Sequence, residues 1–249
     1  MTYPKRLDGE TALILGGAGA IGAATGRMLA EAGARVALTG RNGDAAARAA
    51  GMLPGGAHVG FPADVADTLS LIALRNAIAE RFGGLNILVN AAGFTVPVPH
   101  ADLDALTDEL IDQMFQVNWR GQFAAVRTFA PLLKASGDGL IVNVSSIAGF
   151  TGTGSSIAYC AAKAGVDVMT KSLARVLAPQ VRVLAVSPGV VDTGFVPNRG
   201  ADFNQKTAAA TPLKRIGTAE DVAAAITACA TMLGYSTGHI IQVDGGRAL

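Results

Sequence analysis

The chain has 249 residues, of which 50% are hydrophobic and 16% are charged, so it can bury a large core. Twenty basic and nineteen acidic residues leave a net charge of +1, without the basic stripe or charge block that favours nucleic acid or an anionic membrane. The apolar stretches are too short for a bilayer span, and the first residues contain no signal-peptide core. Two cysteines make no disulfide framework, so we expect a cytoplasmic protein in which Cys160 and Cys229 are small buried hydrophobes.

Short β-rich runs alternate with longer Ala-rich segments along the chain. Strands are expected at residues 11–15, 35–39, 58–61, 86–90, 140–145, 182–187 and 239–243. Helices are expected at residues 20–32, 44–53, 67–82, 107–135, 156–178 and 219–232. This alternation predicts one α/β domain over residues 1–249, a doubly wound fold of about seven parallel strands with helices on both faces. Residues 192–212 fit no βα unit and are a candidate substrate lid.

A glycine-rich turn follows the first predicted strand. It reads Gly16-Gly17-Ala18-Gly19-Ala20-Ile21-Gly22 and leads into a helix. Glycines let the backbone turn tightly and approach a pyrophosphate, and the helix N-terminus adds free amides and a favourable dipole. A glycine cluster alone is weak evidence, but its place ahead of a βαβ unit favours a Rossmann-type dinucleotide site contacted by Gly16, Gly19, Ile21 and Gly22.

The second strand ends in Gly40-Arg41-Asn42, where a dinucleotide fold reads the adenosine ribose. An acid at this point would bond the ribose hydroxyls and select NAD. The guanidinium of Arg41 suits a 2′-phosphate instead, so NADP(H) is the preferred cofactor and NAD(H) the alternative. A solvent-facing arginine after a strand is the competing interpretation.

Tyr159 and Lys163 are one helical turn apart, so their side chains lie on one helix face. A phenol normally titrates near pH 10, and a neighbouring ammonium favours the phenolate and lowers that pKa. The pair can therefore move a proton at neutral pH. The spacing alone also fits a surface lysine lying beside a half-buried tyrosine.

Further landmarks follow one another in a recognisable order. They are Asp64-Val65, Asn90-Ala91-Ala92-Gly93, Asn118, Ser145-Ser146, Ser187-Pro188-Gly189 with Thr193, and Val243-Asp244-Gly245-Gly246. From about Leu7 to the C-terminus the chain resembles the short-chain dehydrogenases/reductases, which include 3-oxoacyl-carrier-protein reductases and many sugar, steroid and polyol dehydrogenases. It departs from their pattern at Leu15, usually Thr, and at Ala20, usually Gly, while Gly19 stands where some members carry a basic residue.

The resemblance implies a catalytic role for four residues. Tyr159 would protonate a carbonyl oxygen during reduction or act as base in the reverse direction, and Lys163 would lower its pKa and hold the nicotinamide ribose. Ser146, thirteen residues before Tyr159, would hydrogen-bond the substrate oxygen, with Ser145 as the competing choice. Asn118 would hold a water in a proton relay leading from Lys163.

The resemblance also implies a set of cofactor contacts. Tyr159 and Lys163 belong to this set, together with three pairs: Asp64 and Val65 at the adenine, Asn90 and Gly93 at the strand end beside the ribose, and Val191 and Thr193 at the carboxamide and phosphate side. The alternative role for Asp64 is to cap the following helix.

The substrate pocket is expected to be mostly apolar. Its candidate walls carry Phe94, Ile147, Phe150, Phe195, Val196 and Phe203. Arg199 and Lys206 could meet an acidic substrate group, such as an acyl-carrier phosphopantetheine, or be solvated loop charges. The three histidines lack metal-ligand spacing, so no catalytic metal is expected.

Family members are mostly tetramers or dimers, so a homotetramer is expected. The apolar residues of the 156–178 helix that could supply a contact face are Val166, Met169, Leu173 and Val176, although core packing would explain them equally well. The favoured function is an NADP(H)-dependent enzyme that interconverts a carbonyl and a secondary alcohol. The alternatives are an NAD-dependent sugar or polyol dehydrogenase and a non-catalytic nucleotide-binding module.

Overall fold

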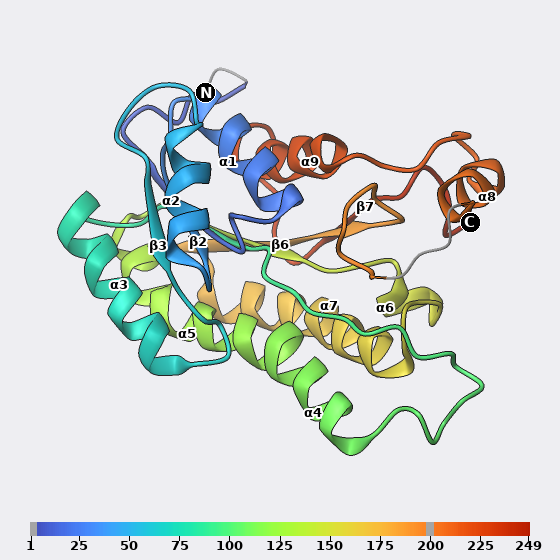
Figure 1. Cartoon of the computed structure of the whole chain (residues 1–249). Helices are drawn as coiled ribbons and strands as arrows, with labels where there is room; N and C mark the ends of the chain where they lie inside the picture. Colours follow the sequence, from blue (N-terminus) through green and yellow to red (C-terminus); the bar gives the residue numbers. More distant parts are fainter. Residues whose placement is uncertain (1–3, 198–201) are drawn as a thin grey trace.

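The computed structural model describes residues 4–197 and 202–249. At its centre lies a seven-stranded parallel sheet in the order β3-β2-β1-β4-β5-β6-β7 (Figure 1). The strands are β1 (Thr11–Leu15), β2 (Arg35–Gly40), β3 (Val59–Pro62), β4 (Ile87–Asn90), β5 (Gly139–Val144), β6 (Val181–Pro188) and β7 (Ile240–Val243). The doubly wound, Rossmann-type arrangement expected from the sequence is confirmed.

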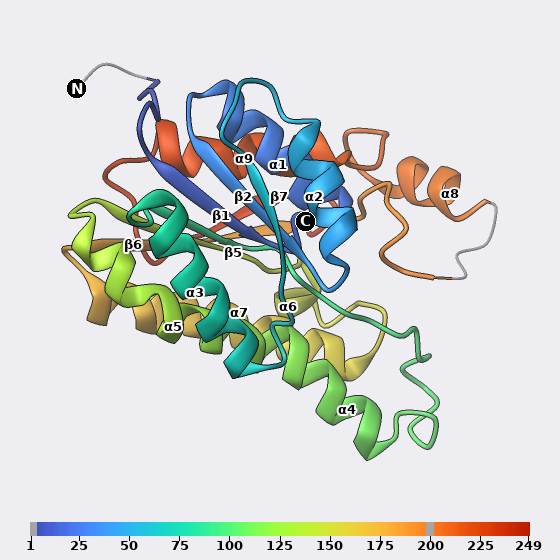
Figure 2. The ribbon, with the colours of Figure 1, turned by 60° about the vertical axis from the view of Figure 1, so that its left-hand side comes forward.

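Two layers of helices cover the sheet (Figure 2). One face carries α1 (Ala20–Glu31), α2 (Gly43–Gly51) and α9 (Ala219–Thr231). The other face carries α3 (Thr68–Phe82), α5 (Gly121–Ala135) and α7 (Ile157–Leu177). Strand order reverses between β1 and β4, and open α/β sheets bind ligands at the carboxyl ends of strands beside such a reversal.

The strands are apolar because both of their faces are buried. All five residues of β1 are buried, and they alternate between the two helix layers as the pleat requires. Leu13 and Leu15 join the core beneath α3, α5 and α7, whereas Ala12 and Ile14 join the core beneath α1 and α9. The cysteines Cys160 and Cys229 are also buried, as expected.

The start of α3 corrects one expectation from the sequence, the capping role of Asp64. The Asp67 carboxylate accepts a hydrogen bond from the Leu69 amide and caps α3, so the alternative role of Asp64 as that cap is wrong. Asp64 instead accepts a bond from the Ala66 amide two residues on. A cap has to precede the first helical turn directly, and α3 starts one turn later than Asp64 would require.

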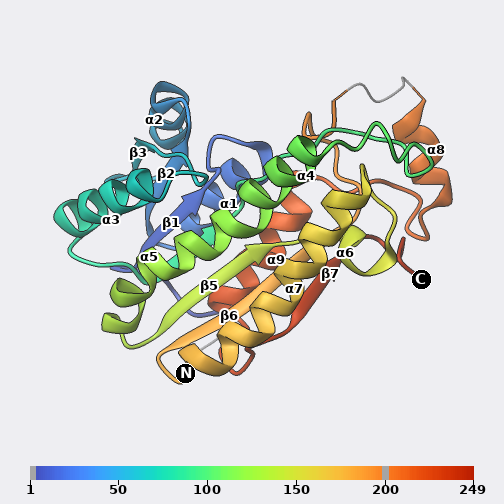
Figure 3. The same cartoon turned by 90° about the horizontal axis from the view of Figure 1, so that it is seen from below.

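The expected helix at 107–135 is three elements. They are α4 (Asp108–Phe115), a π-helical turn η1 (Gln116–Arg120) and α5, which run on in one line (Figure 3). A single π-turn shifts the helical repeat by only about one residue, which is too small a change in the apolar pattern for the sequence to reveal it. The sequence analysis also missed the short helices α6 (Ala148–Thr151) and α8 (Phe203–Ala210), the latter inside the stretch taken as a candidate lid. Within the described part of the chain, none of the helices has the length and apolarity to cross a membrane.

Candidate functional site

A cavity of about 1470 Å³ opens at the carboxyl ends of the strands. Its walls come from the segments that follow β1, β4, β5 and β6, from α7 and α8, and from the segment after β7. Eleven residues of interest line it: Gly16, Gly19, Ile21, Gly22, Gly93, Ser145, Ser146, Tyr159, Lys163, Val191 and Thr193. The fold thus gathers residues that are as much as 177 positions apart, from Gly16 to Thr193, around one space.

The glycine turn is built so tightly that side chains are excluded. Gly16 has a φ of +80°, and a Cβ on it would lie 2.7 Å from the Ala92 nitrogen. A Cβ on Gly22 would lie 2.3 Å from the carbonyl oxygen of Gly16. Helix α1 starts at this turn after its N-cap residue Gly19, which has no side chain to cap the first amides. Ala20, Ile21 and Gly22 at the start of this helix line the cavity, where free amides can hold a phosphate, so the turn fits a dinucleotide.

Both departures from the family pattern in this turn are accommodated. The Leu15 carbonyl accepts a 2.9 Å hydrogen bond from the Ala91 amide, so the backbone itself ties the turn to the segment after β4. Ala20 is the first residue of α1 and is absent from the described non-glycine residues with positive φ, so its methyl group introduces no backbone strain.

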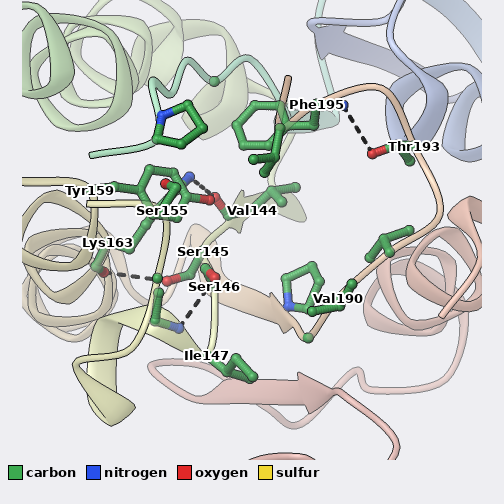
Figure 4. Close-up of a pocket in the computed structure, with 18 of the residues that line it drawn as sticks. Val144, Ser145, Ser146, Ile147, Ser155, Tyr159, Lys163, Val190, Thr193 and Phe195 are labelled. Atoms are coloured by element: carbon green, nitrogen blue, oxygen red, sulfur yellow. Dashed lines mark hydrogen bonds between the residues drawn. The ribbon is translucent and has the colours of Figure 1, made fainter. Parts of the chain in front are cut away.

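Tyr159 and Lys163 lie in the first two turns of α7 and both face the cavity (Figure 4). The Ser156 hydroxyl caps this helix by accepting a 3.1 Å hydrogen bond from the Tyr159 amide. Lys163 Nζ donates to the Val144 carbonyl at 2.8 Å and lies 5.7 Å from the centre of the Tyr159 ring. Lys163 is only 3% exposed, which rules out a surface lysine.

Burial acts on the charge of Lys163. It lowers the pKa of this ammonium from 10.5 to about 8, and the nearby Asp167 carboxylate opposes part of that shift. On the other side, the Tyr159 ring meets Phe195 with ring centres 6.2 Å apart. The Tyr159 phenol therefore lies between an apolar ring, that of Phe195, and a buried cation, the Lys163 ammonium.

The two neighbouring serines have different surroundings. Ser145 is 3% exposed, and its hydroxyl donates to the Lys163 carbonyl at 3.3 Å, which ties β5 to α7. The Ser146 hydroxyl is half-buried and accepts a 3.2 Å bond from the Ala148 amide at the start of α6. Ser145 is thus held as a structural link, whereas Ser146 keeps a hydroxyl that can donate into the cavity.

Asn118 lies in the π-turn and does not line the cavity. Its amide nitrogen donates to the carbonyls of Phe94 at 2.8 Å and Met114 at 2.9 Å, and its amide oxygen accepts from the Phe94 amide at 3.1 Å. Both amide protons are therefore used, so the expected water-holding role cannot fall to this NH₂ group. The side chain fixes the loop next to Gly93 instead.

Four expected cofactor residues lie outside the large cavity. Arg41 is exposed at the end of β2, in the wall of a separate open depression of about 650 Å³. The Asn90 amide is buried and donates to the Asn143 oxygen at 2.8 Å, so its side chain is directed into the protein. Asp64 and Val65 line neither hollow.

Sequence reasoning missed Asp167, one helical turn beyond Lys163. Burial raises the pKa of its carboxyl group, while the neighbouring Ser145 hydroxyl and the charges of Lys163 and Lys171 lower it. One carboxylate oxygen, Oδ1, is buried without a hydrogen-bond partner among the described residues. The spacing of four residues from Lys163 was the available signal.

The substrate side agrees with expectation in part. Ile147, Phe195, Val196 and Phe203 line the cavity, but Phe94 and Phe150 do not. Lys206 forms an ion pair with Asp202 and also lies outside the lining, whereas Arg199 falls outside the described residues. Among the described residues, no three His, Cys, Asp or Glu side chains gather as metal ligands, and the metal expectation stays a prediction.

Comparison with known proteins gives the class of this chain. A family model described as enoyl-(acyl carrier protein) reductase matches residues 16–248. The chain is 38% identical to cis-4-hydroxycyclohexanecarboxylate dehydrogenase of Sinomonas cyclohexanicum, covering 95% of this chain and 96% of the relative. It is 34% identical to the 3-oxoacyl-(acyl-carrier-protein) reductase of Thermotoga maritima, covering 98% and 100% respectively.

The solved structures agree with these sequence matches. The crystal structure of levodione reductase superposes with a TM-score of 0.91 at 26% identity, covering 98% of this chain and 99% of that one. These matches define an oxidoreductase of a family that uses NAD(P)(H), and the fold agrees with them. The chain belongs to the short-chain dehydrogenase/reductase family and is similar to its 3-oxoacyl-(acyl-carrier-protein) reductases.

Proposed function

We propose that this protein uses NADP(H) to interconvert a ketone and a secondary alcohol. The observation that carries the proposal is the shared cavity: Tyr159 and the buried Lys163 line the same space as the glycine turn. A module that only bound nucleotide would have no need of a phenol backed by a buried cation at the reaction end of that space.

Each residue has a distinct task in the proposed mechanism. When bound, the nicotinamide supplies or accepts the hydride. Tyr159 gives its hydroxyl proton to the carbonyl oxygen in reduction and takes it back in oxidation. The charge of Lys163 stabilises the resulting phenolate, and the Ser146 hydroxyl donates to the oxygen that gains negative charge. Asn118 positions the loop beside Gly93 and offers a relay water only its amide oxygen or its backbone.

The experiment that tests this mechanism removes one oxygen atom. Tyr159→Phe should lower kcat for ketone reduction by roughly 10²- to 10⁴-fold and leave the NADPH dissociation constant, measured by fluorescence titration, within about twofold. Tyr235→Phe is the matched control, because Tyr235 is fully exposed and lies outside the cavity lining. Turnover that survives in Tyr159→Phe contradicts the mechanism.

The preference for NADP(H) depends on Arg41. Its guanidinium is exposed next to the glycine turn, whose Ala18 lines the same depression, and no acid lines that depression. Arg41→Ala should raise KM for NADPH by about tenfold and leave KM for NADH nearly unchanged. Arg48→Ala, on the outer surface of α2, is the control. A wild-type enzyme that prefers NADH overturns this part of the proposal and favours an NAD-dependent dehydrogenase.

The substrate class follows from the cavity and from the relatives. Three named relatives act on ketones or alcohols: a 3-oxoacyl thioester reductase, a hydroxycyclohexanecarboxylate dehydrogenase and levodione reductase. The apolar cavity wall supports a ketone with an alicyclic or acyl body. A screen of cyclic ketones, 3-oxoacyl thioesters and polyols with NADPH and NADH decides among them.

We also propose a homotetramer. Val166, Met169 and Leu173 of α7 are buried in the core, but Val168 and Val176 on the same helix are 62% and 69% exposed. Phe123 of α5 adds a partly exposed ring stacked on Trp119. Light scattering on the purified chain tests the assembly; a monomer at micromolar concentration contradicts it.

A further inference from the structure

The described residues in the walls of the large cavity carry positive charge and no carboxylate. Among the described residues that line it, the basic side chains are Lys163, Arg247 and a single histidine, His100. Asp and Glu are absent from that lining. Lys163 has a task in the proposed mechanism, whereas Arg247 has none.

Among the residues that the structure describes, Arg247 has no acidic partner that would neutralise its charge. The nearest acid in sequence, Asp244, is held by the backbone: it accepts hydrogen bonds from the amides of Gly246 at 2.9 Å and Ala248 at 2.8 Å. Within residues 4–197 and 202–249, no ion pair involves the Arg247 guanidinium. The residues outside those ranges include neither Asp nor Glu.

The other acids of this region are also engaged. Asp192 accepts a 3.0 Å hydrogen bond from Asn204, and Asp202 pairs with Lys206. Neither acid lines the cavity. Lys206, the cation that the sequence offered for an acidic substrate, is thus neutralised outside the cavity, and the available positive charge is on Arg247.

Arg247 lies at the substrate end of the cavity rather than the phosphate end. The glycine turn follows β1, Tyr159 faces the ends of the middle strands from α7, and Arg247 follows β7 at the far edge of the sheet. The segment around Arg247 is tied to the one after α8, because the Leu213 amide donates to the Gly245 carbonyl at 3.1 Å. A dinucleotide whose phosphates lie on α1 and whose reactive ring reaches Tyr159 leaves this edge to the substrate.

We propose that Arg247 determines substrate specificity by binding an anionic group of the substrate, separated from the reacting carbonyl by an apolar body. This inference rests on the proposed function for the identity of the substrate end. A guanidinium is permanently charged and matches carboxylate and phosphate oxygens with two parallel donors. Val96, Ile147 and Phe195 supply apolar walls, which strengthen such a pair by limiting water.

The test compares matched neutral and anionic ketones with NADPH. One pair is 4-methylcyclohexanone and 4-oxocyclohexanecarboxylate; the other is acetoacetyl-pantetheine and acetoacetyl-phosphopantetheine. In Arg247→Gln, kcat/KM for the anionic member of one pair should fall by roughly 10- to 100-fold, while the neutral member changes less than twofold. The pair that responds tells whether the anion is a carboxylate or a phosphate. Arg247→Lys should recover part of the loss, and Arg48→Gln, on the surface of α2, should behave as wild type.

A binding measurement separates this proposal from the proposed function. Cyclohexanecarboxylate and phosphopantetheine contain no ketone, so calorimetric titration into the NADPH-saturated enzyme needs no turnover. Binding of one of them by wild type, weakened at least tenfold in Arg247→Gln, supports the anion site even if every ketone fails. Equal binding by the two proteins, no binding by wild type, or an equal loss for neutral and anionic ketones overturns it.

Discussion

The burial of Lys163 predicts an unusual pH dependence of stability. Folding lowers the pKa of this ammonium from 10.5 to about 8, because the charged form loses hydration. At neutral pH the charged Lys163 ammonium is less stable in the folded chain than in the unfolded chain, and this lowers the free energy of unfolding. As pH rises from 8 to 10.5, the folded state releases the proton first, so the unfolded state binds more protons and stability increases.

The size of the effect follows from the shift. A difference of 2.5 pKa units, from 10.5 to 8, corresponds to roughly 3 to 4 kcal/mol at about 1.4 kcal/mol per unit, of which about 3 kcal/mol falls between pH 7 and pH 10.5. The measurement compares Tyr159→Phe with Tyr159→Phe/Lys163→Met, so that the phenol does not titrate in the same window. Urea unfolding at equal protein concentration, from pH 7 to pH 10.5, gives the free energy of unfolding of each variant.

The expected result is a difference that changes with pH. The variant that retains Lys163 should gain about 3 kcal/mol relative to the Met variant, since other ionisable groups cancel in the comparison. The groups that act on the ammonium, the Asp167 carboxylate and the Val144 carbonyl, are present in both proteins. A difference that stays flat, or that falls as pH rises, would refute the claim that burial dominates the pKa of Lys163.

Three further outcomes are expected. Asp167→Asn removes the charge that raises the pKa of Lys163, so this pKa should fall further and the alkaline limb of the kcat profile should move to lower pH; an unmoved limb contradicts the coupling. Gly22→Ala places a Cβ 2.3 Å from a carbonyl oxygen and should weaken NADPH binding at least tenfold in a fluorescence titration, whereas Gly51→Ala, which meets nothing within 4 Å, should not. Burial raises the pKa of the Cys229 thiol to about 12, so it should resist iodoacetamide at pH 8 until urea unfolds the chain; modification of the native protein argues against burial.

The mechanism and the specificity proposals separate the two ends of one cavity. In the proposed mechanism Tyr159 and Lys163, which line the cavity, act at the reacting oxygen, so their loss should lower turnover of every ketone. Arg247 acts at the far edge of the sheet, and its loss should change only the choice between neutral and anionic ketones. Variants at both ends therefore give different kinetic patterns, which makes each proposal testable without the other.

The sequence by itself determined the architecture and predicted the candidate catalytic pair. Apolar runs mark strands buried on both faces, and each of the seven strands that the structure describes begins and ends within one residue of its predicted bounds, as at Thr11–Leu15 and Ile240–Val243. The glycine turn and the spacing of Tyr159 and Lys163 are local patterns, since a tight turn and a helix face are fixed by neighbours in the chain.

Only the tertiary structure decided which side chains share a space and which polar groups are already bonded. The π-turn commits the Asn118 amide to Phe94 and Met114, and α7 holds Ser145 in place, leaving Ser146 to face the cavity. The Lys206–Asp202 ion pair is local, because the two residues are four positions apart, whereas only the fold places Arg247 in the cavity wall without a carboxylate among the described residues. Burial and the contacts of the cavity depend on segments distant in sequence, so no local pattern encodes them.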